Sequence, residues 1–211
     1  MRLALMSVAA VALAAGGAFA QTAAPAGPDR AIAAQPAGVY VVDPGHTSVV
    51  WSVGYQGLAQ YTARFDKVAA EITLDPKDPT KSSVSATIDA MSISTGYKGE
   101  VRNYTSFDEK VAVEAFDAKT HPTITFKSTG IRTTGDNTGV ITGDLTLAGV
   151  TKPVTLNATF NGGQFNRFAQ KQALGFTATT TIKRSEWGVT DWIPVVGDDT
   201  TITINAVLLK Q

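Results

Sequence analysis

The feature that most constrains this chain is an apolar–polar alternation with a period of two. In 154–160 and 202–208, apolar residues alternate mainly with threonine and asparagine. Shorter stretches of the same kind occur at 84–88, 124–126, 145–147 and 176–182. Successive side chains of a β-strand point to opposite faces, so this pattern predicts strands with one buried and one solvated face. Threonine suits the solvated face because it is β-branched and keeps its hydroxyl in water.

Residues that favour turns separate these stretches and suggest how the strands are arranged. The candidate turns are Asp75-Pro76, 134–137, 161–163 and 197–199. About eight antiparallel strands result, and such a set closes most naturally into a barrel or a strongly curved sandwich, because closure removes exposed sheet edges. We therefore predict an all-β fold, an antiparallel eight-stranded barrel with one short helical segment at 107–113.

The interior of such a barrel is either filled by large side chains or wide enough for one slender ligand. The expected inward positions carry both small and aromatic residues: Ala70, Ala86, Ala158, Ala178 and Ala206 among Trp51, Phe65, Phe126 and Phe160. Small residues leave room for a cavity, but they also accommodate bulky neighbours in a solid core. The alternation alone leaves both interiors open.

Residues 1–20 have the pattern of a secretory signal peptide. A single positive charge at Arg2 precedes an apolar run over 3–15, and Ala18-Phe19-Ala20 supplies the small residues before a cleavage site. This run is shorter than the roughly 20 residues of a membrane-spanning helix. We therefore expect cleavage, export as a secreted or periplasmic protein, and no integral membrane span in the mature chain.

The expected domain organisation follows from a change of composition after the signal peptide. Residues 21–38 are rich in Ala, Pro and Gly and have no periodic apolar face, which is typical of a flexible leader. Residues 39–211 form the expected single folded unit. A chain of this length buries enough surface to fold without disulfides, and it contains no Cys.

Composition excludes several kinds of chemistry. Without Cys there is no thiol nucleophile, Cys-ligated zinc or iron–sulfur centre. Lys plus Arg equals Asp plus Glu at 18 each, so charge gives no reason to expect a nucleic-acid partner. The only histidines, His46 and His121, lack metal-ligand spacing, and no nucleophile or nucleotide motif is present. We predict a protein that is not an enzyme and has no metal and no cofactor.

Five motifs occur in a defined order along the folded unit. They are Tyr40-x-x-Asp43-Pro44-x-His46-Thr47-Ser48, Ser92-Ile93-Ser94-Thr95, Phe116-Asp117-Ala118 followed by His121–Phe126, Gly143–Val154, and Lys183–Val189. In these motifs the chain resembles the YceI family of periplasmic polyisoprenoid-binding proteins. Differences from the family's usual pattern occur at Tyr55, at 107–111 and in a longer 96–106 segment.

The resemblance implies a lipocalin-like barrel whose apolar tunnel holds an isoprenoid lipid, either a polyprenyl chain or a prenylated quinone. It thereby favours the hollow interior. The expected tunnel wall is Trp51, Val53, Tyr55, Phe65, Ile88, Ile93, Phe116, Phe126, Leu147 and Trp187, with Asp108 and Lys110 at the mouth. A homodimer is compatible with such a barrel. The alternatives are a non-carrier envelope stress or interaction protein with a filled barrel, and an enzyme acting on a lipid-like substrate.

Overall fold

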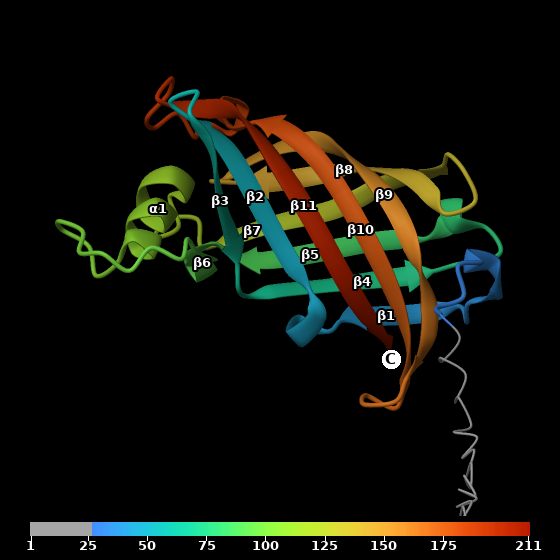
Figure 1. The fold of residues 1–211 in the computed structure, drawn as a ribbon. Helices are drawn as coiled ribbons and strands as arrows, with labels where there is room; N and C mark the ends of the chain where they lie inside the picture. Colours follow the sequence, from blue (N-terminus) through green and yellow to red (C-terminus); the bar gives the residue numbers. More distant parts are fainter. Residues whose placement is uncertain (1–26) are drawn as a thin grey trace, which may run out of the picture.

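The computed structural model describes residues 27–211, so the expected signal peptide and the start of the expected leader lie outside the described residues. The described part contains a single α-helix, α1 (Phe107–Phe116), and otherwise short 3-10 turns and strands (Figure 1). The strand segments are β1 (Gly38–Val42), β2 (Ser48–Tyr55), β3 (Ala59–Phe65), β4 (Val68–Leu74), β5 (Ser83–Asp89), β6 (Ile93–Ser94), β7 (Thr123–Thr133), β8 (Thr138–Leu147), β9 (Val150–Asn166), β10 (Lys171–Lys183) and β11 (Val196–Lys210). No helix among these residues is long and apolar enough to span a membrane.

These segments form eight long strands, because three of the strands are bent into two pieces each. The bent strands are β1 with β2, β3 with β4, and β5 with β6. Along β11, for example, β1 pairs Val42 with Leu208 and β2 continues by pairing Ser48 with Asn205. Every long strand is antiparallel to its neighbours in sequence, and β11 returns to the first strand and closes the ring. The predicted eight-stranded antiparallel barrel is confirmed.

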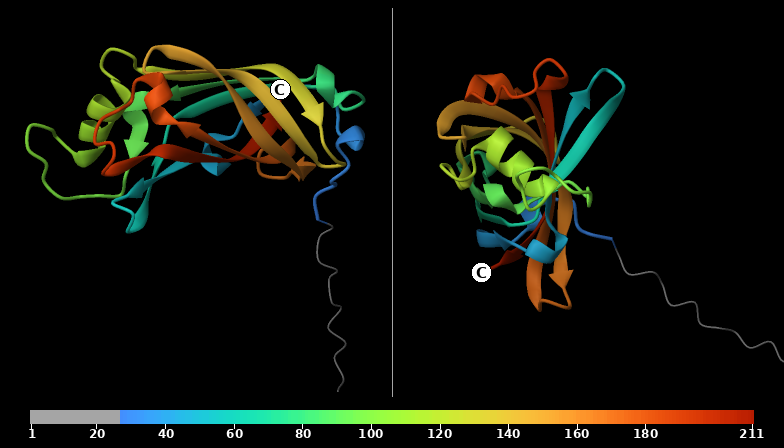
Figure 2. Two further views of the ribbon diagram at one scale, coloured as in Figure 1. Left: turned by 90° about the horizontal axis from the view of Figure 1, so that it is seen from above. Right: turned by 90° about the vertical axis from the view of Figure 1, so that its left-hand side faces the viewer.

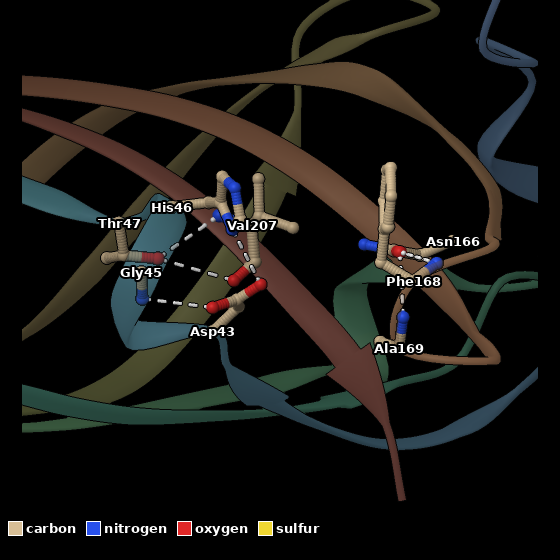
Figure 3. Close-up of polar contacts among 8 residues, drawn as sticks. All are labelled: Asp43, Gly45, His46, Thr47, Asn166, Phe168, Ala169 and Val207. Carbon is tan, nitrogen blue, oxygen red and sulfur yellow. Dashed lines mark hydrogen bonds and ion pairs between the residues drawn. The ribbon is translucent and has the colours of Figure 1, made fainter.

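The bend between β1 and β2 is built by side chains of the first sequence motif (Figure 3). The Asp43 carboxylate accepts a hydrogen bond from the Gly45 amide at 2.9 Å and contacts the His46 ring nitrogen Nδ1 at 2.9 Å. The Thr47 hydroxyl donates to the Val207 carbonyl at 3.3 Å and accepts from the Val207 amide at 3.2 Å. Thr47 therefore replaces backbone pairing where the strand leaves the ladder, and Asp43 fixes the corner.

Two predicted turns are wrong. Residues 161–163 lie inside β9 and residues 197–199 lie inside β11, each beside a bulge rather than a chain reversal. The glycines of the first site instead make room for a neighbouring segment, because a Cβ at Gly163 would overlap the Gln35 side chain. In the sequence alone, a glycine that lets another segment pack closely looks the same as a glycine that forms a turn.

The neighbouring segment is residues 28–35, which we call the N-terminal segment. Asp29 exchanges two backbone hydrogen bonds with Gly163, at 2.9 and 2.8 Å, and Gln35 is buried. This part of the chain was expected to be a flexible leader. In the structure it packs against β9, because the hydrogen bonds and the buried glutamine hold it there.

Helix α1 is three residues longer than predicted and lies across one end of the barrel, which we call the helix end (Figure 2). The Ser106 hydroxyl accepts a hydrogen bond from the Glu109 amide at 3.0 Å, the usual start of a helix. Asp117, with a φ of 45°, ends it. The helix turns Val111 and Ala112 into the core, so its apolar side faces the barrel interior.

Candidate functional site

The barrel is hollow. A cavity of about 1040 Å³ extends through it, from Lys110 and Trp192 at the helix end to Ile32 and Asn137 at the far end. On β5, the inward residues Val84, Ala86 and Ile88 all line this cavity and are only half-buried, although they face the interior. A solid core would bury them completely. The structure therefore favours the hollow interior over the filled one.

The cavity wall is overwhelmingly apolar and includes most of the predicted tunnel residues. Those that line it are Trp51, Val53, Tyr55, Phe65, Ile88, Phe116, Phe126 and Leu147, together with Lys110 at the mouth. They come from strands all around the ring and from α1. Their contact with a ligand stays a prediction, while their position on the wall is a feature of the structure.

Three predicted site residues do not line the cavity. Ile93 is buried beside Phe65, its partner in the β3–β6 pairing. Trp187 is only 2% exposed, and its indole nitrogen donates to the Leu145 carbonyl at 3.1 Å. Asp108 accepts hydrogen bonds from Thr95, at 2.8 Å from the amide and 2.5 Å from the hydroxyl. Ile93 and Trp187 are covered by packed core neighbours, and Asp108 is held by Thr95, so none of the three side chains meets the cavity.

Several aromatic wall residues were not among the predicted tunnel residues: Tyr61, Phe107, Phe160, Phe176 and Trp192. Phe160 and Phe176 occupy apolar positions of the alternating stretches, so the periodicity could have identified them as wall residues. Tyr61 lies on β3, where it alternates with Gln60 and Thr62 in the same phase as Phe65, so the periodicity could have identified it too. Trp192 lies outside any strand, where the period of two gives no signal.

Five aromatic residues gather inside the helix end and form what we call the aromatic cluster: Trp51, Tyr61, Phe65, Phe107 and Phe116. The ring centres of Trp51 and Phe116 are 5.9 Å apart, and those of Phe65 and Phe116 are 5.5 Å apart. Tyr61 lies 6.1 Å from Trp51 and 6.4 Å from Phe107, the latter edge-on. These spacings are typical of favourable aromatic pairs, so α1 and the barrel wall hold one another in place.

The rim of the cavity at the helix end is apolar with one cation. Tyr55, Trp192 and Val195 line the cavity and are also exposed at 44, 39 and 49%. The Lys110 ammonium lies 5.5 Å from the centre of the Trp192 ring and 3.4 Å from the Glu114 carboxylate. The cavity wall therefore continues onto the outer surface at this end.

A buried arginine supports this rim. Arg184 is 7% exposed, and its guanidinium donates to four backbone carbonyls, those of Val189, Asp191, Val196 and Gly197, at 2.8 to 3.0 Å. Three of these carbonyls flank residues 190–195, which we call the rim loop; the fourth, that of Asp191, belongs to this loop, as does Trp192. Arg184 thus fixes the rim loop.

Few charged residues line the cavity. Those on its wall are Glu100, Lys110, Asp136 and Arg184, and each lies on a different element. Within residues 27–211 no group of three or more His, Cys, Asp or Glu side chains is placed to hold a metal ion. The arrangement is suited to enclosing an apolar molecule.

Comparisons with known proteins agree with this architecture. A family model described as a YceI-like domain matches residues 40–208. A UPF0312 protein of Pseudomonas putida is 34% identical over 145 residues, which is 68% of this chain and 71% of that protein. A UPF0312 protein of Vibrio cholerae is 32% identical over 152 residues, 71% of this chain and 77% of that protein.

Solved structures show the same fold. The crystal structure of Burkholderia cenocepacia BcnA aligns with a TM-score of 0.67 and 27% identity, covering 79% of this chain and 98% of BcnA. A polyisoprenoid binding domain from Saccharophagus degradans, implicated in plant cell wall breakdown, aligns with a TM-score of 0.59 and 12% identity. That alignment covers 83% of this chain and all of the domain.

Proposed function

Because this chain belongs to the YceI-like domain family, we propose that it is a periplasmic carrier that holds an isoprenoid lipid inside its barrel. The ligand is a polyprenyl chain or the tail of a prenylated quinone. The observation that carries the proposal is the apolar cavity of about 1040 Å³ that extends through the barrel. The neighbouring fold described as a polyisoprenoid binding domain supports the choice of ligand class.

The size of the cavity agrees with this ligand class. At about 30 Å³ for each water-sized group, the cavity accommodates on the order of thirty carbon atoms, which corresponds to about six isoprene units. Its elongated course through the barrel suits a chain better than a compact molecule. The cavity therefore has room for a single isoprenoid chain of this length.

The apolar wall accounts for affinity without any charged contact. Each buried methylene-sized carbon contributes about 0.8 kcal/mol, so a dozen well-packed carbons contribute roughly 10 kcal/mol before the cost of ordering the chain. Such an interaction recognises apolar length and does not require a catalytic step. The proposal accordingly describes binding and transfer, and the homodimer stays a prediction.

Lipid extraction of protein purified from its own host tests the proposal. We expect a co-purifying prenyl lipid in near-stoichiometric amount by mass spectrometry, and uptake of a tetraprenyl alcohol by stripped protein. A variant with Ala178→Phe places a ring inside the cavity and should take up less, whereas Thr177→Val, on the outward face of the same strand, should behave as the wild type. Absence of lipid and of uptake in the wild type would exclude the carrier.

A filled-barrel interaction protein is the competing proposal. It predicts that the protein binds no prenyl lipid and that Ala178→Phe behaves as any overpacked core variant. Lipid extraction and the uptake assay with Ala178→Phe therefore distinguish the carrier from the interaction protein.

A further inference from the structure

The hairpin that joins β9 to β10 extends beyond the rest of the barrel. β8 follows β9 only as far as the pair of Thr138 with Thr159, and β11 follows β10 only as far as the pair of Leu209 with Ala173. Residues 164–172, which we call the hairpin tip, therefore pair as strands only within the hairpin. Figures 1 and 2 show this orange hairpin projecting from the barrel.

The hairpin tip carries two exposed phenylalanines. Phe168 is fully exposed, at 102%, and Phe165 is 55% exposed. Neither residue lines the cavity. A single exposed apolar side chain is normal on a protein surface, but phenyl rings that gather on one projecting hairpin form an apolar surface that requires an explanation. Neither the core nor the cavity accounts for these two rings.

The turn at the end of the hairpin tip is held in a defined shape (Figure 3). The side-chain oxygen of Asn166 accepts hydrogen bonds from the amides of Phe168 and Ala169, at 2.9 and 3.0 Å. At the base of the hairpin, the Gln172 side chain donates to the Gln35 side chain of the N-terminal segment at 3.1 Å. The fold therefore supports the hairpin at its base and presents the Phe168 ring to the surroundings.

The charge beside these rings is positive. Residues 145–185 contain no Asp or Glu, although the chain has 18 of them. The hairpin tip carries Arg167 and Lys171, which are both exposed and form no ion pair in the part of the chain that the structure describes. Asp29 bonds to the base of the hairpin through its backbone, and its carboxylate accepts from the Ala31 amide at 2.8 Å. The two cations of the tip are thus available to an external anion.

We propose that the hairpin tip is a contact site for the surface of an anionic lipid bilayer. Phe165 and Phe168 enter the boundary between headgroups and acyl chains, and Arg167 and Lys171 face the lipid phosphates. Apolar rings beside cations are the combination that holds a protein segment at such a surface. The contact is reversible because few side chains make it. This inference goes beyond the proposed function, since it requires no ligand in the cavity.

The other exposed apolar residues lack this charge pattern. Leu58, in the turn between β2 and β3, is 81% exposed, and Trp192 of the rim loop is 39% exposed. The rim loop carries the acidic residue Asp191, and Lys110 at the rim contacts the Glu114 carboxylate at 3.4 Å. An anionic surface would be repelled by these carboxylates. The helix end is therefore a poorer fit, and Leu58 supplies a matched control.

Sedimentation with vesicles tests the proposal. We expect the wild type to bind vesicles of phosphatidylglycerol and phosphatidylcholine in equal amounts more tightly than vesicles of phosphatidylcholine alone. This preference should disappear in 1 M salt, where the Debye length is about 3 Å. Phe168→Ser should weaken binding about tenfold, and Arg167→Gln about fivefold. Leu58→Ser, which removes an equally accessible apolar side chain from another hairpin, should leave binding unchanged.

A second readout locates the contact. The chain has no Cys, so Ala169→Cys gives a single site for an environment-sensitive fluorescent dye at the hairpin tip. The emission of this dye should shift to shorter wavelength when anionic vesicles are added, because the dye enters a less polar medium. The same dye attached through Leu58→Cys should show no shift.

Three results would overturn the inference. They are a wild type that does not bind anionic vesicles, an equal loss of binding in Phe168→Ser and Leu58→Ser, and a dye response at residue 58 without one at residue 169. If Phe168→Ser instead converts a dimer to a monomer in analytical ultracentrifugation and leaves vesicle binding unchanged, the tip is an interface between two copies and the membrane contact fails. These vesicles contain no prenyl lipid, so the outcome is independent of the uptake assay that tests the carrier.

Discussion

Adding a ring to the inner wall of the barrel should stabilise the fold, and the sign of this effect tests the hollow interior. Ala178 lines the cavity on β10, and its neighbours across the sheet are Ala158 and Ile204. A phenyl ring of six carbons needs about 180 Å³ at roughly 30 Å³ per water-sized group, far less than the 1040 Å³ present. Burying the ring contributes up to about 1.5–3 kcal/mol, and we expect Ala178→Phe to gain about 1 kcal/mol because one side of the ring still faces the cavity.

The matched control is Ala112→Phe. Ala112 is fully buried on α1 and is not part of the cavity wall. There the ring must displace packed neighbours, which costs about 1–3 kcal/mol. Urea denaturation of the stripped proteins, followed by circular dichroism, measures both changes as shifts of the midpoint. If Ala178→Phe loses as much stability as Ala112→Phe, side chains fill the barrel in solution and the reasoning is refuted.

Three further changes test other parts of the structure. Arg184→Met removes four hydrogen bonds to the rim loop and should cost about 3 kcal/mol, with faster amide exchange confined at first to that loop; unchanged exchange would contradict the clamp. The bonds that the Asp198 carboxylate accepts from the Ser185 amide and hydroxyl lower the pKa of that carboxyl. Its stabilisation is therefore present above the ordinary aspartate pKa of about 3.9 and is lost as pH falls through the lower folded-state value, so Asp198→Asn should lower the unfolding midpoint at pH 7, and by progressively less as the pH falls below that ordinary value. Gly163→Ala should release the N-terminal segment and cost about 1–3 kcal/mol, detected as faster proteolysis there, whereas Gly175→Ala, where a Cβ meets only ordinary contacts, should not.

The period of two predicted the barrel well because alternation is a local property of a strand and its face. Positions such as Val53, Phe126 and Leu147 could be assigned to the inner wall from spacing and motif alone, and the structure places them there. The spacing could not show whether an inward side chain lines the cavity or packs against another side chain. Ile93 and Trp187 are inward and conventional core, because partners distant in sequence cover them.

The misread segments share a different cause. Gly162 and Gly163 were interpreted as a turn, and the N-terminal segment as a leader, because each was considered alone. The glycines and the N-terminal segment explain one another only when they are side by side in space. The hydrogen bonds that Asp108 accepts from Thr95 were likewise invisible, since no periodicity links a helix start to a loop residue thirteen positions earlier.

The order of the strands has a consequence for how the chain acquires its shape. Each long strand pairs with the one before it in sequence, so a growing chain can add strand to strand as a widening, curved sheet. Only β11 joins the two ends, through its bonds to β1 and β2. Without β11, the other strands would form an open, curved sheet with two unpaired edges. The fifteen residues of β11 therefore close the barrel, and their loss should open the cavity before it abolishes secondary structure.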